Sequence, residues 1–375
     1  MPSPASAHFS GTVQRFDPAR QSPVDSQAIA RLVQASSKAG PRLILWDLVG
    51  SCNLKCPSCP VGSMAGTNPK GLITDETFEA VLAKLAREFP KAQLHFYNWT
   101  EPLIHPRIND YCKAAADAGF HLHLSSNLNH LKNPEGLMAS GMKTFRISLS
   151  GSTQAVYEMG HRGGKIEKVK QNMRRLSAAK KATGSRTRIH VYFHKYRHNL
   201  HEVGLMDSLA RELDFDFIAD WAFLMPVEKL IQYAEDDLDD DQRSFANDAI
   251  VPAVNDALAL MQPHRAQPCE LIDQLVLDFR GHVSLCCAVY DGQRNFIGNY
   301  LDWSWERLQA IKYQHQSCVK CMHYGAHVLY THFANPDLRE AVEQLATQDL
   351  ERLTARSRRT SIRLPVLTQG LAESA

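Results

Sequence analysis

Three cysteines in a short stretch form the first set of side chains with the types and spacing for chemistry. Cys52, Cys56 and Cys59 have a C-x3-C-x2-C spacing. A structural zinc site takes four ligands, and the next candidate, His95, lies far away in sequence. An iron–sulfur cubane takes four thiolates, so three would leave one iron open to a substrate or cofactor. The spacing therefore favours an iron–sulfur cluster over zinc.

A second group of cysteines lies in the last third of the chain. It comprises Cys269, Cys286, Cys287, Cys318 and Cys321. Four of these thiols suffice for one fully ligated [4Fe–4S] cluster, with Cys287 competing with Cys286 for one position. Spacing alone leaves a four-thiolate zinc site as the alternative. The ninth cysteine, Cys112, lies in a helical stretch, where we expect a small buried apolar residue.

Strand-like and helix-like segments that could position these cysteines alternate between residues 41 and 223. The expected strands are 42–49, 93–99, 120–126, 143–151, 188–194 and 215–223. Helical stretches lie between them, including one that Thr74 would cap, and others around 105–118, 166–183 and 200–213. About six βα units in succession predict a parallel sheet, either open or rolled into a barrel.

The alternation within the strands helps to choose between these two forms. In 145–150 the apolar residues Phe145, Ile147 and Leu149 alternate with Arg146, Ser148 and Ser150, and 121–125 and 188–194 alternate likewise. Strands covered by helices on both faces would be almost continuously apolar. A complete eight-stranded barrel fills its centre with branched apolar side chains. A polar inner face therefore favours a wider, incomplete barrel.

The first cysteine motif, on the loop after the first strand, resembles the signature of the radical S-adenosylmethionine (SAM) superfamily. The resemblance covers about residues 41–225 and implies a partial (βα)6 TIM-like barrel of the α/β class. It also implies a [4Fe–4S] cluster on Cys52, Cys56 and Cys59 whose open iron chelates SAM. An electron from the cluster then cleaves SAM and releases a 5′-deoxyadenosyl radical, which abstracts hydrogen from the substrate.

Two strand-end motifs resemble SAM-contacting segments of this family. Asn98-Trp99-Thr100-Glu101-Pro102 is similar to the family's GGEP motif, with Trp99 and Thr100 in place of the glycines. Ser125-Ser126-Asn127 is similar to a strand-end Thr-Thr-Asn. The resemblance thus implies cofactor contacts for Thr100, Glu101, Ser126 and Asn127.

Three further positions complete the expected SAM site. Ser148-Leu-Ser150-Gly151 resembles a Ser-x-Asp-Gly motif that reaches the ribose, with Ser150 in place of the acid. Arg162 resembles an arginine that pairs with the carboxylate of SAM, a task suited to a planar guanidinium. Ser58 lies where the family usually has an aromatic residue. This departure matches a subgroup with the sequence CPxCP.

The second cysteine group resembles the C-terminal SPASM/twitch extensions of radical SAM enzymes. The matching features are Gly281-His-Val-Ser-Leu-Cys286, Ile297-Gly298-Asn299, a Trp-bearing helix and the closing Cys-x2-Cys. A full SPASM domain has about seven cysteines and this segment has five, so a small α+β twitch-type domain is the better match. The resemblance implies one auxiliary [4Fe–4S] cluster on Cys269, Cys286, Cys318 and Cys321.

Composition and charge set the remaining expectations. The chain of 375 residues has 44% hydrophobic and 22% charged residues and a net charge of +2, so nothing in its charge points to nucleic acid or a membrane surface. It has no signal-peptide pattern and no apolar run long enough to span a bilayer, so we expect a cytoplasmic protein. The expected units are an N-terminal extension (1–40), the barrel (41–235), a linker (236–265), the twitch-like domain (266–325) and a C-terminal helix with a basic tail (326–375).

The resemblance leads to one main functional hypothesis. A fully ligated auxiliary cluster suits an oxidation, so we expect an oxidoreductase that dehydrogenates, or modifies by related radical chemistry, a small polar metabolite similar to a sugar or an aminocyclitol. Arg146, His190, Tyr192 and His194 would hold the substrate, with Arg146 or Tyr192 as the proton acceptor. An electron donor such as flavodoxin or ferredoxin would supply the reducing electron.

Two alternatives remain open from the sequence. One is a maturase that epimerises or cross-links a ribosomally made peptide. Residues 1–40 look too short and too polar for the peptide-recognition domain that such enzymes often carry. The other is a non-catalytic iron–sulfur or zinc protein, against which the SAM-contact motifs argue.

Overall fold

A single sheet of nine strands organises the computed structural model, which describes residues 26–64, 66–312 and 314–359. The strand order is β6-β5-β4-β3-β2-β1-β7-β8-β9. The first six strands pair in parallel with their neighbours in the chain. They are β1 (Leu43–Trp46), β2 (Gln93–His95), β3 (His121–Ser126), β4 (Thr144–Leu149), β5 (Arg188–Lys195) and β6 (Asp216–Trp221). Because β6 does not pair with β1, the sheet stays open, which confirms the predicted incomplete barrel.

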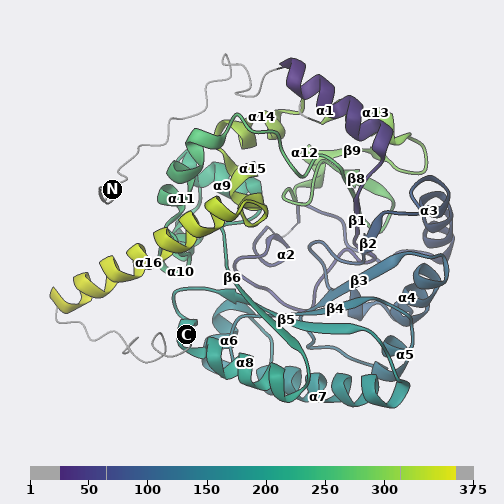
Figure 1. Cartoon of the computed structure of the whole chain (residues 1–375), viewed down its shortest axis with the longest axis horizontal. Helices are drawn as coiled ribbons and strands as arrows, with labels where there is room; N and C mark the ends of the chain where they lie inside the picture. Colours follow the sequence, from purple (N-terminus) through teal and green to yellow (C-terminus); the bar gives the residue numbers. More distant parts are fainter. Residues whose placement is uncertain (1–25, 65, 313, 360–375) are drawn as a thin grey trace.

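Helices cover the outer side of this curved sheet (Figure 1). They are α3 (Asp75–Glu88), α4 (Ile108–Asp117), α5 (Pro134–Met138), α6 (Gln154–Gly160), α7 (Ile166–Thr183) and α8 (Val203–Glu212). Helix α3 begins where predicted, because the side chain of Thr74 accepts a hydrogen bond from the backbone N–H of Thr77. Cys112 on α4 is fully buried in the core, as expected.

The two faces of the central strands differ in the predicted way. Phe145, Ile147 and Leu149 of β4 are fully buried beneath the outer helices. Arg146 and Ser148, which point to the other side, are only half-buried. The inner side of the sheet is therefore polar.

The C-terminal strands continue the barrel's sheet. Strand β7 (Gln274–Leu277) pairs in parallel with β1, and β8 (His282–Ser284) and β9 (Phe296–Asn299) follow as antiparallel neighbours. This arrangement covers the free edge of β1, whose backbone N–H and C=O groups would otherwise lack strand partners. The twitch-like region is thus fused to the barrel through one sheet.

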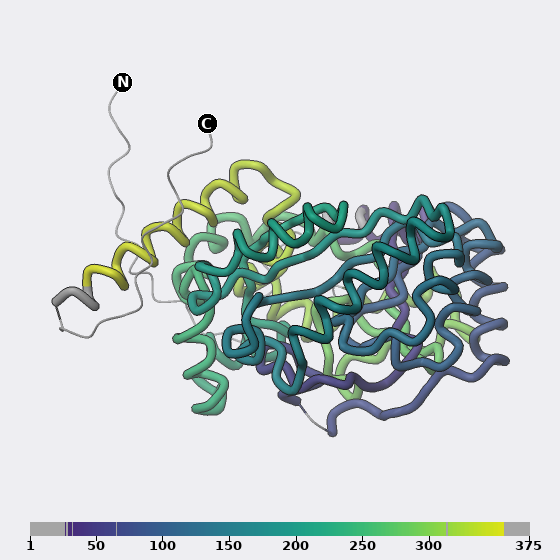
Figure 2. The backbone as a smooth tube through the Cα atoms, turned by 90° about the horizontal axis from the view of Figure 1, so that it is seen from below, coloured from purple at the N-terminus to yellow at the C-terminus, as the bar shows by residue number. Residues whose placement is uncertain are grey.

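The remaining helices gather mostly between β6 and the C-terminal strands, and α16 projects from the body (Figures 1 and 2). They are α2 (Pro60–Ser63), α9 (Val227–Ala234), α10 (Asp240–Ala249), α11 (Val254–Met261), α12 (Gly292–Asn295), α13 (Trp305–Ile311), α14 (Gln316–His323), α15 (Ala326–Thr331) and α16 (Pro336–Arg359). The segment 236–265, expected to be a linker, contains α10 and α11. Helix α10 begins at the acidic run, where Asp239 caps it. Helix α16 confirms the predicted C-terminal helix, while most of the expected basic tail lies outside the described residues. No described helix meets the length and hydropathy needed to cross a membrane.

The N-terminal segment is the main error of the sequence reading. Within residues 1–40, expected to be a loose extension, Ser26–Ala39 form helix α1, while 1–25 lie outside the described residues. The indole N–H of Trp305 on α13 donates a hydrogen bond to the carbonyl oxygen of Ser36 on α1, at 2.9 Å. Ile29 and Val33 of the same helix pack against buried Met322. These two apolar residues and the Trp305 hydrogen bond anchor the helix.

Candidate cofactor sites

The first cysteine group lies on the loop between β1 and α2, near the centre of the curved sheet (Figure 1). Cys59 precedes α2, and its carbonyl oxygen accepts hydrogen bonds from the backbone N–H groups of Gly62 and Ser63. Gly62 packs so tightly that an added Cβ would lie 2.5 Å from the carbonyl oxygen of Cys56. The loop is therefore held against its own helix in one compact conformation.

The thiols of this loop are close enough to influence one another. Burial raises the pKa of Cys52 to about 12 and that of Cys59 to about 11. Burial also raises the pKa of Cys56, and the negative charges of Cys59 and Cys52 raise it further. Three buried thiols favour the thiolate form only when a metal centre compensates the charge.

Zinc and an iron–sulfur cubane differ in how closely their thiolate ligands must converge. Zinc would hold sulfur ligands about 2.3 Å from one ion. Within 26–64, 66–312 and 314–359, no three His, Cys, Asp or Glu side chains come together closely enough to hold a single metal ion. A cubane, whose thiolates bind different irons, does not need such close convergence. Three thiolates would fill three of the four positions of such a cluster.

The end of β3 reaches the cysteine loop through Asn127. Its side-chain amide donates hydrogen bonds to the Oδ1 of Asn53, at 2.8 Å, and to the Sγ of Cys52, at 3.6 Å. Its backbone N–H donates to the carboxylate of Glu101 at 2.8 Å, and the hydroxyl of Ser126 donates to the same carboxylate at 2.8 Å. The segments predicted to meet SAM, around Glu101 and Asn127, are thus brought together beside Cys52.

Glu101 is only 3% exposed. Its carboxylate also accepts a hydrogen bond from the backbone N–H of Leu103, at 3.1 Å. Burial raises the pKa of Glu101 to about 7, against the opposing effect of these hydrogen bonds. The carboxylate therefore ties together the ends of two strands.

Asp47, which the sequence reading missed, shapes the segment after β2. Its buried carboxylate accepts hydrogen bonds from the backbone N–H groups of Asn98, Trp99 and Thr100, at 2.9, 3.1 and 3.3 Å. The hydroxyl of Thr100 donates to it at 2.7 Å. Since the hydroxyl and the backbone N–H of Thr100 both donate to Asp47, its carbonyl oxygen is the part left for a cofactor. The one signal in the sequence was an acid at the end of an apolar strand.

The other predicted SAM contacts occupy different surroundings. The hydroxyl of Ser150 is fully buried and lies 2.6 Å from the Nδ1 of His161. Ser148 is half-buried on β4. Ser58 hydrogen-bonds with the buried Tyr196. Arg162 is exposed, and its carbonyl oxygen accepts a hydrogen bond from the backbone N–H of Lys55 at 3.0 Å, which places it beside the cysteine loop.

Lys229 on α9 is a second residue that sequence reasoning missed. It is 2% exposed, and its Nζ donates hydrogen bonds to the hydroxyl of Ser63 and, at 2.6 Å, to the Oε1 of Gln242. Burial lowers the pKa of Lys229 to about 8, while the negative charge of Cys59 raises it. A buried cation therefore lies near the first cysteine group, contributed by a helix whose sequence gave no sign of it.

The inner face of the barrel carries a cluster of aromatic and basic side chains. The guanidinium of Arg146 lies 4.6 Å from the ring centre of Tyr97 and 5.2 Å from that of Tyr192, and its Nε donates to the hydroxyl of Ser125 at 2.9 Å. Tyr192 hydrogen-bonds with Asp220, and both burial and that carboxylate raise the pKa of Tyr192.

The histidines on this inner face are neutral at physiological pH. Burial lowers the pKa of His95 to about 3 and those of His190 and His194 to about 4. The positive charge of Arg146 lowers all three further. The structure therefore gathers the predicted Arg146, His190, Tyr192 and His194 on one face, where Arg146 carries the positive charge.

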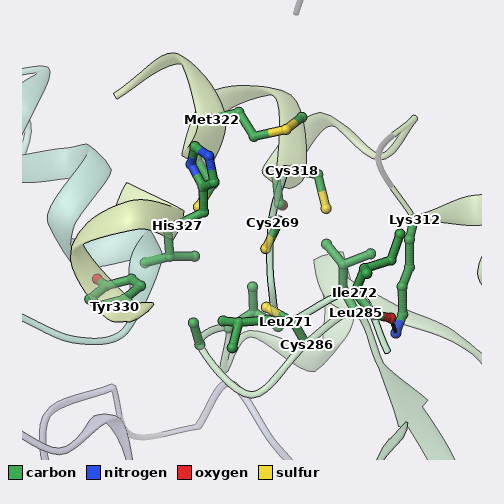
Figure 3. Close-up of a pocket in the computed structure, with 15 residues that line it drawn as sticks. Cys269, Leu271, Ile272, Leu285, Cys286, Lys312, Cys318, Met322, His327 and Tyr330 are labelled. Carbon is green, nitrogen blue, oxygen red and sulfur yellow. Dashed lines mark hydrogen bonds between the residues drawn. The ribbon is translucent and has the colours of Figure 1, made fainter. Parts of the chain in front are cut away.

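The second cysteine group gathers around one buried cavity (Figure 3). The lining cysteines are Cys269, Cys286, Cys318 and Cys321. They come from three separate segments: the stretch before β7, the stretch after β8, and α14. The spacing of Cys318 and Cys321 on α14 puts both on one helical face. Apolar side chains, including Leu271, Ile272 and Leu285, complete the wall.

Cys286 and Cys287 have different surroundings. Cys286 lines the cavity, and its negative charge acts on Cys321 together with those of Cys269 and Cys318. Cys287 hydrogen-bonds with Gln274 of β7. The geometry thus favours Cys286 over Cys287 as the fourth side chain of the group.

Trp99 connects the two cysteine groups. The Sγ of Cys59 lies 3.8 Å from the carbonyl oxygen of Trp99. The indole N–H of Trp99 donates a hydrogen bond to the carbonyl oxygen of Val289, at 2.9 Å. Val289 lines the second cavity together with Cys286. The tryptophan that replaces a glycine of the family motif therefore spans the space between the two groups.

Comparison with known proteins agrees with this geometry. Residues 47–202 match the sequence model of the radical SAM superfamily. This range includes Asp47, the first cysteine group and the strand-end motifs. Over 123 residues the chain is 28% identical to an AdoMet-dependent heme synthase of Methanosarcina barkeri. That alignment covers 32% of this chain and 34% of the relative, so it spans about a third of the relative's length.

Two solved structures share the fold. The structure described as native anSMEcpe with bound AdoMet has a TM-score of 0.50 and 15% sequence identity, covering 73% of this chain and 81% of that one. Streptococcus suis SuiB bound to the precursor peptide SuiA has a TM-score of 0.51 and 11% identity, covering 82% of this chain and 74% of that one. The sequence match over residues 47–202, which include the cysteine loop after β1, supports a radical SAM superfamily enzyme.

Proposed function

We propose that this chain is a radical SAM oxidoreductase that dehydrogenates, or modifies by related radical chemistry, a small polar metabolite. The observation that carries this proposal is the cavity in which Cys269, Cys286, Cys318 and Cys321 converge. A second, fully ligated cluster at that place would give the enzyme an electron acceptor in addition to its radical-generating centre.

The first site would be assembled by the loop after β1. Cys52, Cys56 and Cys59 would hold a [4Fe–4S] cluster, which supplies with SAM a 5′-deoxyadenosyl radical. The proposed SAM contacts are Ser58, Thr100, Glu101, Ser126, Asn127, Ser148, Ser150 and Arg162. Thr100 would act through its carbonyl oxygen, because its hydroxyl and N–H already bond with Asp47. Ser150 would act through its backbone, because its hydroxyl bonds with His161. Arg162 is exposed beside the loop and can pair with the carboxylate of SAM.

The oxidation needs an electron acceptor and a proton acceptor. Loss of a hydrogen atom next to a substrate hydroxyl leaves a radical that must lose one more electron and one proton to become a carbonyl. The four cysteines of the second site would hold the [4Fe–4S] cluster that takes the electron. Flavodoxin or ferredoxin would provide the electron that starts each turnover.

The inner face of the barrel would bind the substrate and take its proton. A guanidinium offers only hydrogen-bond donors, which suits Arg146 to substrate binding better than to proton acceptance. Tyr192 hydrogen-bonds with Asp220, so its hydroxyl can pass a proton to that carboxylate while taking one from the substrate. We therefore assign substrate binding to Arg146 and proton relay to Tyr192, with Asp220 as the final acceptor.

Iron content tests the two-cluster arrangement. Anaerobically reconstituted protein should hold about eight irons, and the Cys52→Ala/Cys56→Ala/Cys59→Ala variant about four. Zinc in place of iron at the second site, or a triple variant with about eight irons, would contradict the proposal.

Substrate class is tested with SAM, a reductant and two panels of compounds. One panel contains polyols and aminocyclitols deuterated next to a hydroxyl, and the other contains peptides. Transfer of deuterium into 5′-deoxyadenosine together with formation of a ketone from the first panel is the expected result. Reaction with peptides alone would instead identify a peptide maturase.

A further inference from the structure

Lys312 places a buried ammonium group beside the second cysteine group (Figure 3). It follows the last turn of α13 and is only 4% exposed. Its Nζ donates hydrogen bonds to the carbonyl oxygens of Ile272 and Gln274, at 2.7 and 2.6 Å. Both acceptors belong to the stretch that leads from Cys269 into β7, so the ammonium is fixed in place by the same segment that carries a cysteine.

The charges that act on Lys312 identify what compensates for its burial. Removing an ammonium from water costs several kcal/mol unless a negative group lies nearby. The negative groups that stabilise its charged form are, in decreasing order, Cys286, Cys318, Cys269 and Asp273. Asp273 is itself paired with Arg42. Thiolates in this cavity are therefore the main negative charges that act on Lys312.

We propose that the positive charge of Lys312 raises the reduction potential of an iron–sulfur cluster held by Cys269, Cys286, Cys318 and Cys321. This inference rests on the auxiliary cluster of the proposed function. A cubane with four thiolates becomes more negative by one charge when it is reduced, and net charge is one determinant of its potential. A fixed cation in a cavity of low dielectric constant stabilises the reduced state more than the oxidised state.

The consequence for the reaction concerns the direction of electron flow. In the proposed oxidation the substrate radical would pass one electron to a cluster held by these four cysteines, and its hydroxyl proton would pass to Tyr192 and Asp220. Raising the cluster's potential makes that transfer more favourable. Lys312 would thus bias the second site toward accepting electrons.

A second lysine near these cysteines is unsuited to this role. Lys320 lies on α14 between Cys318 and Cys321, but its Nζ pairs with the carboxylate of Glu235 at 3.1 Å. The side chains of Lys320 and Glu235 are 28% and 25% exposed, so water screens the pair and its net charge is close to zero. Lys312 is the more effective source of positive potential.

Redox titration of the reconstituted full-length protein, followed by electron paramagnetic resonance, tests the inference. Lys312→Met removes the charge and the hydrogen bonds, Lys312→Gln removes the charge but keeps a donor, and Lys312→Arg keeps the charge. Lys84→Met is the matched control, because Lys84 also donates to backbone carbonyls, those of Tyr300 and Trp303, but acts on the α3 side of β9. The Cys52→Ala/Cys56→Ala/Cys59→Ala variant identifies the signal of the second cluster.

The neutral variants should lower the midpoint potential of the second cluster. The expected size is at least a tenfold fall in the ratio of reduced to oxidised cluster at a fixed potential, which is about 59 mV for one electron. Lys312→Arg and Lys84→Met should stay close to the parent protein.

Each other outcome has a definite meaning. A parent protein with about four irons would refute the auxiliary cluster itself, and with it the proposed function. An intact second cluster with an unchanged potential in Lys312→Met and Lys312→Gln would overturn the role of Lys312 alone. The role of Lys312 would also be overturned if both neutral variants lost that cluster while Lys312→Arg retained it, because Lys312 would then serve cluster assembly.

Discussion

Replacing Asp47 should loosen the segment after β2 on which the SAM site is proposed to rest. The carboxylate of Asp47 accepts three backbone N–H groups and the hydroxyl of Thr100. Asp47→Ala leaves all four donors without this acceptor inside the protein. The segment would then lose the geometry that holds Trp99 between the two cysteine groups.

The size of the effect follows from these four hydrogen bonds. At about 1.5 kcal/mol each, the low end for bonds to a charged group, they sum to about 6 kcal/mol of the free energy of unfolding. Burial opposes the charged carboxylate and raises its pKa, and water entering the truncated site satisfies some of the donors. We therefore expect a loss of about 3 kcal/mol for Asp47→Ala and a smaller loss for Asp47→Asn, which keeps one oxygen.

Urea unfolding of the full-length protein under anaerobic conditions measures this loss. The matched control is Asp239→Ala, which removes an aspartate that accepts one backbone N–H at the start of α10 and should cost about 1 kcal/mol. SAM affinity, measured on the same samples by calorimetry, should fall for Asp47→Ala and stay unchanged for Asp239→Ala. Equal losses of stability in the two variants would refute the reasoning.

Three further predictions concern single side chains. Burial raises the pKa of Glu101 from about 4.5 in the unfolded chain to about 7, so the folded state binds more protons than the unfolded state and stability should decline as pH rises from about 4.5 to about 7. Glu101→Gln should remove that part of the pH dependence. A profile of urea midpoint against pH that is the same in Glu101→Gln and the parent protein would contradict this prediction. Cys286→Ser should lose about four irons while Cys287→Ser keeps them, and the reverse result in an iron assay would exchange their roles. Tyr192→Phe should slow product formation by about 100-fold while SAM cleavage continues, because Tyr192 passes the proton to Asp220; an unchanged ratio of product to 5′-deoxyadenosine would exclude the relay.

The features that the sequence predicted best depend on local pattern. Alternation in 121–125, 145–150 and 188–194 predicted both the strands and their polar inner face, because side chains alternate between the faces of a strand. The helix that starts after Thr74 was recognisable from its cap and its apolar positions. Order along the chain also predicted which strand ends would meet at the cysteine loop, since parallel strands place their carboxyl ends at one edge.

The features that were missed depend on contacts between distant segments. Asp47 acts on a loop about fifty residues away, and Lys312 acts on carbonyls of a segment that precedes it by about forty residues. The pairing of β7 with β1 joins segments more than two hundred residues apart, which no local pattern encodes. Helix α1 was missed although Ile29 and Val33 lie one turn apart, because Met322, against which they pack, is distant in the chain. Burial and charge at such positions follow from the folded chain rather than from the sequence motif.

Reductive cleavage of SAM tests the central claim most directly. The reconstituted protein, incubated anaerobically with SAM and dithionite, should form 5′-deoxyadenosine and methionine, measured by chromatography and mass spectrometry. The Cys52→Ala/Cys56→Ala/Cys59→Ala variant should form none, while Cys112→Ala, which changes a buried core cysteine of α4, should retain the activity. Absence of 5′-deoxyadenosine from iron-loaded parent protein, or equal amounts from the triple variant, would contradict the assignment of the radical-generating centre to the loop after β1.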